Sequence, residues 1–202
     1  MIRFTVGICV GMLVLTGAAA VWISMSEAPS SDEYLKPDDL RAIGIQPTEW
    51  RSQRYFLADG VTKHEYGCSL NGGNTVIQGE VRVGVARDAF VDALALEESN
   101  ARNPKRPPEN IYVVKRDVYA KEHGGEGGAE GFVAVRMYPR PQGGDTTAEV
   151  WMQEGRNFFR ARVAEVGVRD DRIAERRDWC ERQARTIAQV MLGQVRDAQL
   201  KK

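Results

Sequence analysis

The stretch RNFFRARVAEV, residues 156–166, decides the fold because apolar and charged side chains alternate along it. The apolar positions are Phe159, Ala161 and Val163, and the charged ones between them are Arg160 and Arg162. Such alternation is typical of a β-strand with one buried face. Residues 111–119, 131–138 and 146–152 have similar strand-like compositions and are joined by short Gly-rich or polar segments. We therefore expect neighbouring strands to be antiparallel.

A long helix over residues 169–199 follows this strand. Six of its residues fall on one stripe at helical spacing: Ile173, Cys180, Ala184, Ile187, Met191 and Val195. A stripe of this kind predicts a helix lying on a sheet.

The preceding half of the chain predicts further elements. Residues 35–44 carry Pro37 and two Asp residues at the start and Gly44 at the end, which favours a helix of about two turns. Residues 45–64 indicate little beyond a short strand near 55–57. A hairpin with its turn at 71–74 and a helix from Asp88 to about residue 99 follow. The prediction is an α+β fold, a largely antiparallel sheet of about five or six strands packed by the long C-terminal helix and a shorter helix.

The N-terminus adds an apolar block, FTVGICVGMLVLTGAAAVWI, over residues 4–23. Its length matches the roughly 20 residues of a membrane-spanning helix and exceeds the usual signal-peptide core. We predict an anchor or signal peptide at 1–25, a flexible linker at 26–34 and an extracytoplasmic domain at 35–202. The protein is then held in the cell membrane by a single pass, or secreted after cleavage near Ala20. Ala18 stands where a lipidated Cys would be, which excludes lipidation at this site.

Charge excludes one class of function. The 28 Lys and Arg residues balance the 28 Asp and Glu residues. A neutral chain gives no support for nucleic-acid binding, which depends on neutralising phosphates, so we expect no such partner.

Cys68 and Cys180 are the predicted disulfide. One lies in a strand and the other on the apolar stripe of the last helix, and thiols outside the cytoplasm usually oxidise. The bond would close a loop of somewhat over a hundred residues and stabilise the chain by about 4 to 5 kcal/mol. A metal site using His64 and Cys68 lacks a second ligand pair, so we expect no metal and no cofactor.

Catalytic motifs are weak. The segment Gly67-Cys68-Ser69-Leu70-Asn71 resembles a nucleophile elbow but ends in Asn where Gly is required. His123 lies in a Gly-rich loop without a clear nucleophile. We predict no enzyme, and keep a hydrolase using Ser69 and His123 as the least favoured alternative.

Polar strand positions suggest a binding surface. Arg160 and Arg162 should line a polar sheet face near Arg136, and such a cluster would bind an anionic ligand or partner. Two alternatives stay open for Trp151, Tyr138 and Phe158: an exposed aromatic patch, or packing beneath a helix.

Three segments together resemble a family of small secreted actinobacterial cell-envelope lipoproteins of unknown function. They are LKPDDLRAIGI at 35–45, Gly67-Cys68-Ser69 before a strand, and Cys180 followed by an apolar helix face. The lipobox Cys is replaced by Ala18, and a frequent Asp-Pro-Cys is replaced by Asp32-Glu33-Tyr34. The resemblance implies an envelope location, an α+β domain and the disulfide, but no catalytic residues.

The functional hypothesis is therefore a membrane-tethered, non-enzymatic binding or interaction domain of the cell envelope. Its working surface would be the sheet face or the loops at 100–109 and 122–130, and its partner an envelope protein or ligand. The alternative is a sensor of a small molecule or cell-wall ligand, which needs a pocket between sheet and helix.

Overall fold

The computed structural model describes residues 34–57, 60–70, 73–85, 88–119, 129–140 and 143–201. The predicted anchor, nearly all of the predicted linker and His123 lie outside these residues. None of the helices in the described part of the chain is long and apolar enough to span a membrane.

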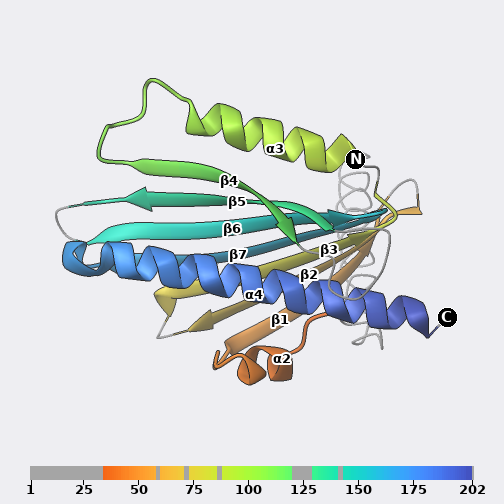
Figure 1. Ribbon diagram of the computed structural model, residues 1–202. Helices are drawn as coiled ribbons and strands as arrows, with labels where there is room; N and C mark the ends of the chain where they lie inside the picture. Colours follow the sequence, from red (N-terminus) through yellow and green to blue (C-terminus); the bar gives the residue numbers. More distant parts are fainter. Residues whose placement is uncertain are drawn as a thin grey trace, which may run out of the picture. The chain divides into compact units, whose positions relative to one another are not determined.

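Seven strands form one antiparallel sheet, which confirms the predicted α+β class with more strands than expected. In chain order they are β1 (Thr48–Phe56), β2 (Thr62–Leu70), β3 (Thr75–Val83), β4 (Ile111–Tyr119), β5 (Ala129–Tyr138), β6 (Gly144–Glu154) and β7 (Asn157–Val168). Their order in the sheet is β1-β2-β3-β7-β6-β5-β4 (Figure 1). The chain builds one half of the sheet, crosses to the far edge through α3 (Asp88–Ala101), and returns strand by strand until β7 pairs with β3.

Helix α4 (Ile173–Leu200) covers one face of this sheet and packs chiefly on β6 and β7 (Figure 1). It follows a short 3-10 turn, η3 (Asp170–Arg172). All six residues of the predicted stripe are buried. They join the apolar side chains of the sheet, among them Val150 and Phe159, in the main core. The apolar stripe therefore correctly predicted where this helix lies.

Helix α2 (Pro37–Ala42) closes the β2 and β3 side of the same core. Leu35 and Leu40 are almost completely buried there, and the Lys36 backbone N–H donates to Asp39 Oδ2 at 2.8 Å. Gly44 ends the segment with a φ of +82°, a conformation that glycine adopts without strain.

Helix α3 packs on the opposite face of the sheet. Its Phe90 contacts Phe132 at a ring separation of 5.5 Å and belongs to a second, smaller core. The helix lies over β4 and β6, so β2, β3 and β7 keep polar side chains that are not under it. This partial cover positions the candidate site.

Cys68 and Cys180 are free cysteines in the structure, so the predicted disulfide is not formed. Both thiols are buried in the main core, as the apolar stripe predicted for Cys180. However, α4 packs on β6 and β7, while Cys68 lies on β2, with β3 between it and β7. Neighbouring strands are about 4.8 Å apart, so sharing a core does not bring two cysteines within bonding range.

Candidate functional site

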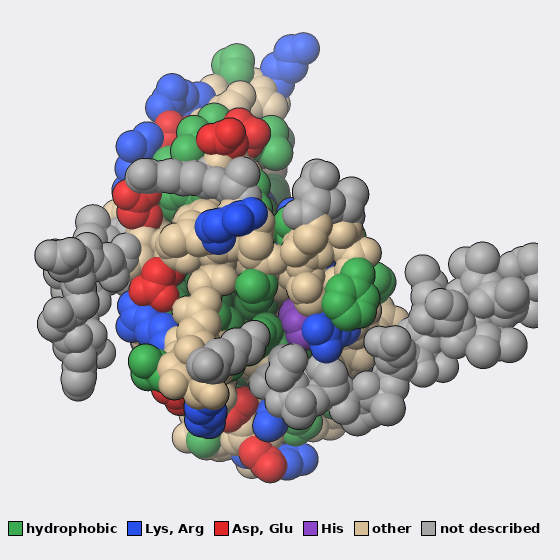
Figure 2. All heavy atoms as spheres, turned by 90° about the vertical axis from the view of Figure 1, so that its right-hand side faces the viewer, with side chains coloured by type: hydrophobic (Ala, Val, Ile, Leu, Met, Phe, Trp, Pro, Cys, Tyr) green, Lys and Arg blue, Asp and Glu red, His purple; other side chains and the backbone are tan. Residues whose placement is uncertain are grey.

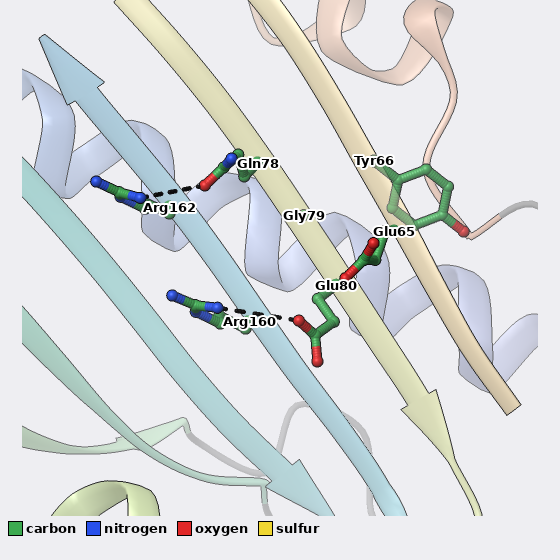
Figure 3. Close-up of a pocket in the computed structure, with 7 residues that line it drawn as sticks. All are labelled: Glu65, Tyr66, Gln78, Gly79, Glu80, Arg160 and Arg162. Carbon is green, nitrogen blue, oxygen red and sulfur yellow. Dashed lines mark hydrogen bonds and ion pairs between the residues drawn. The ribbon is translucent and has the colours of Figure 1, made fainter. Parts of the chain in front are cut away.

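The candidate site is the half of the sheet opposite α4 that α3 leaves uncovered. We call it the open face and define it by Glu65 on β2, Gln78 and Glu80 on β3, and Arg160 and Arg162 on β7. Figure 3 shows these side chains on the side of the sheet away from α4. They surround a hollow of about 180 Å³, to which Tyr66 and Gly79 also contribute. The sensor hypothesis placed a pocket between sheet and helix, but this hollow lies on the other face.

A chain of ion pairs crosses the sheet beside this hollow. Arg136 Nη2 lies 2.7 Å from Glu97 Oε2 on α3, and Arg136 Nη1 lies 3.0 Å from Glu149 Oε2. Arg160 also binds Glu149, and its Nη1 lies 3.9 Å from Glu80 Oε2. Burial favours neutral Arg136, but hydrogen bonds and charges from Glu97 and Glu149 outweigh it and raise the pKa of Arg136 above its usual value. The network therefore holds fixed charges in fixed positions.

Glu149 is the centre of this network. Its side chain is 2 % exposed and accepts hydrogen bonds from Arg136 and Arg160. A carboxylate this deeply buried is tolerated only when it is paired. Arg136 and Arg160, which the sequence analysis placed near each other on one polar face, are thus joined through Glu149, an acid that it did not single out.

Glu80 forms the other end of the network. It is 6 % exposed and contacts Arg82, with Lys63 Nζ at 3.9 Å. Lys63 also pairs with Glu65 on the same strand. Along β3, Glu80 alternates with the core residues Ile77 and Val81, a pattern that indicates the polar side of the strand. The pattern does not indicate that Glu80 is buried.

Arg162 differs from these cations. Its Nη1 is 3.3 Å from Gln78 Oε1, a neutral partner, and its Nε is buried without a hydrogen-bond partner. Within the described part of the chain it has no carboxylate partner, whereas Arg82, Arg136, Arg160 and Lys63 each have one. Of the two arginines that define the open face, Arg162 is therefore the one without a carboxylate partner among the described residues.

Trp151 lies at the border of the open face. It stacks on Phe132 at 5.7 Å and contacts Phe158 at 5.6 Å, within the core beneath α3. Arg160 lies 4.7 Å from its ring centre. Packing beneath a helix is thus correct for Trp151 and Phe158, and Tyr138 does not belong to that cluster.

Groups that would support catalysis are placed unfavourably. Burial raises the pKa of the Cys68 thiol to about 11 and that of Cys180 to about 12, so both stay protonated at neutral pH. Ser69 donates a hydrogen bond to Glu49 Oε2 at 3.0 Å, and His123 lies outside the described residues. Among the residues that the structure describes, no three His, Cys, Asp or Glu side chains are grouped to hold a metal ion.

The molecular surface carries mixed charge, as the balanced composition suggests. Figure 2 shows acidic and basic side chains interspersed over the end of the molecule where α4 finishes. Comparison with known proteins adds no assignment, since no protein family, curated protein or solved structure matches this chain.

Proposed function

We propose that this chain is a non-enzymatic binding domain of the cell envelope, tethered to the membrane by its N-terminal apolar segment, and that its working surface is the open face. One observation carries the proposal: a rigid set of paired charges surrounds an accessible hollow that contains an unpaired arginine.

Packing alone does not account for such a network. Buried ion pairs commonly contribute no more stability than apolar residues of the same size, because desolvation offsets their attraction. On a binding surface, ion pairs have a different effect. Side chains that they already hold in place lose little conformational entropy when a partner binds. Val76 and Val166, 37 % and 54 % exposed, add apolar area on the strands that carry Gln78 and Arg162.

The proposed partner is a protein or ligand of the envelope, and the membrane association rests on the length of the apolar segment at 4–23. The sensor alternative is supported by the hollow, whose volume of about 180 Å³ would suit a small chemical group.

Photo-cross-linking from single positions tests this function. A benzophenone amino acid at Val76 on the open face should form a reproducible adduct when the full-length chain is in its native membrane. The control is the same substitution at Val113 on β4, which has a similar exposure of 41 % but lies on the same side of its strand as Lys115, whose side chain contacts α4. Adducts at both positions or at neither would reject the open face as a surface that binds a protein partner.

A further inference from the structure

We infer that Arg162, together with Gln78, binds a single carboxylate group of the ligand or partner that occupies the open face. This inference rests on the proposed function and specifies its chemistry.

The first argument is the unmet hydrogen-bonding capacity of Arg162. A guanidinium has five N–H donors arranged to match the two oxygens of a carboxylate. Arg162 uses one of them, on a long 3.3 Å contact to Gln78, while its buried Nε has no acceptor. Buried donors are almost always satisfied, so an unsatisfied one on a charged group marks Arg162 as a side chain whose hydrogen-bonding capacity the described residues do not use up.

The second argument is the space beside this pair. Gly67 on β2 lies directly across from Gln78 in the strand register, so no side chain fills that position of the open face. A Cβ atom at Gly67 would meet nothing closer than the Ile77 carbonyl oxygen at 3.9 Å. The absence of a side chain at this position therefore leaves open space beside Gln78 on the β2 side.

The third argument is charge. Arg160 is already paired with Glu149 and Glu80, so Arg162 contributes one uncompensated positive charge. The carboxylates of Glu65 and Glu80 line the same hollow. They would repel the second charge of a phosphate dianion, since like charges at short range are unfavourable. One planar monoanion fits this balance better than phosphate.

The carboxylate could belong to a free small acid or to an acidic side chain of a partner protein. A hollow of about 180 Å³ admits the carboxylate and a few neighbouring atoms in either case. Two probes separate these sources: acetate, and a peptide with blocked ends that contains one Glu.

The test follows the arginine Nε–H signals and backbone amides of the full-length chain by NMR at constant ionic strength. Acetate should produce a saturable shift at Arg162 and Gln78, with a dissociation constant on the order of millimolar, as expected for so small a ligand. Acetamide, which has the same shape without the charge, should produce none. Equal affinity for acetate and the Glu peptide indicates a free acid, whereas tighter binding of the peptide indicates a partner side chain.

Variants supply the controls. Arg162→Gln should weaken acetate binding by about tenfold or more, because the charge-assisted hydrogen bonds are lost. Gly67→Val should also weaken it by placing a side chain beside Gln78 while leaving the arginine in place. Arg102→Gln, on a side chain that is 79 % exposed, should leave it unchanged. Backbone amide spectra verify that each variant is folded.

Failure of the two proposals can be told apart. No saturable shift with acetate, or equal shifts in the Arg162→Gln variant, overturns the carboxylate inference. If Val76 still forms its adduct, the open face remains the working surface. Acetate binding without an adduct at Val76 supports the carboxylate site and rejects the protein-partner form of the proposed function.

Discussion

Replacing the central acid of the ion-pair network should destabilise the fold. Glu149→Gln keeps the shape of the side chain but removes the charge shared by Arg136 and Arg160. Removing one partner of a buried ion pair costs about 3 to 5 kcal/mol, because the remaining charge stays desolvated. Arg136 retains Glu97 at 2.7 Å, and Arg160 retains the more distant Glu80. We therefore expect a loss at or below the lower end of that range, about 2 to 3 kcal/mol.

Urea denaturation of the purified chain measures this loss. With a denaturant dependence of about 2 kcal/mol per molar urea, the midpoint should fall by about 1 to 1.5 M. The matched control is Glu175→Gln on α4, whose carboxylate is 65 % exposed and pairs with Arg172. Surface ion pairs of this kind contribute little, so the control should leave the midpoint unchanged.

A midpoint for Glu149→Gln equal to that of the control would refute the reasoning. It would mean that the two arginines reach solvent easily once the acid is neutral. A double-mutant cycle with Arg160→Gln gives a second criterion: the two substitutions should be less destabilising together than the sum of their separate effects. Simple additivity would show that Arg160 and Glu149 are not energetically coupled.

Three further predictions concern the core and the helix surface. Gly79→Val should destabilise the chain by about 1 to 3 kcal/mol in the same urea assay, because overpacking forces neighbouring atoms apart. A Cβ atom added at Gly79 would already lie 3.1 Å from Met191 Sδ. Cys68 and Cys180 should resist a maleimide reagent in the folded protein and both react after unfolding, as mass spectrometry of their peptides would show. Unlabelled Cys68 and Cys180 after unfolding, with Cys9 labelled, would contradict the free cysteines. Burial raises the pKa of Glu181, but hydrogen bonds and charges from Lys115 and Arg185 outweigh it and lower that pKa overall. The ionised Glu181 carboxylate therefore stabilises the fold at pH values above the pKa of this group in the unfolded chain. This contribution is lost as the pH falls through the lower pKa of the folded protein. Glu181→Gln should therefore make the free energy of unfolding less dependent on pH in the acid range.

The sequence predicted the elements well because their periodicity is local. The stripe from Ile173 to Val195 is buried on the sheet, and the alternation at 156–166 places Phe159 in the core and Arg160 on the opposite face. β1 was harder to predict. Its residues are mostly exposed, and it pairs with a single neighbour, so it has almost no buried face to produce a pattern.

The disulfide shows where local patterns fail. Periodicity correctly indicated that Cys180 is buried, but it does not specify the order of strands in a sheet. That order follows from the crossing through α3, which makes β7 the neighbour of β3 and leaves β3 between β7 and the strand that carries Cys68. Whether two distant cysteines lie within bonding range therefore depends on the strand order, which the local sequence around neither cysteine specifies.

The acids of the candidate site were missed for a related reason. An acid that alternates with apolar residues, as Glu149 does with Ala148 and Val150, has the pattern of a solvent-facing position. Glu149 is buried instead, because the arginines of the two flanking strands close over it and α3 supplies Glu97 to the same network. Its burial depends on three other elements, β5, β7 and α3, and the last of these is distant in sequence.

Arg160 and Arg162 illustrate how this arrangement creates a site. They are two residues apart on β7 and share a face, so the sequence gives no reason to distinguish them. In the structure Arg160 is opposite Glu80 and Trp151, while Arg162 is opposite Gln78 and Glu149. Glu149 accepts hydrogen bonds from Arg136 and Arg160, whereas Arg162 donates to Gln78. Arg162 thus has no carboxylate partner among the described residues, and exchanging Gln78 for Glu should remove the carboxylate preference of the open face by supplying that partner from within.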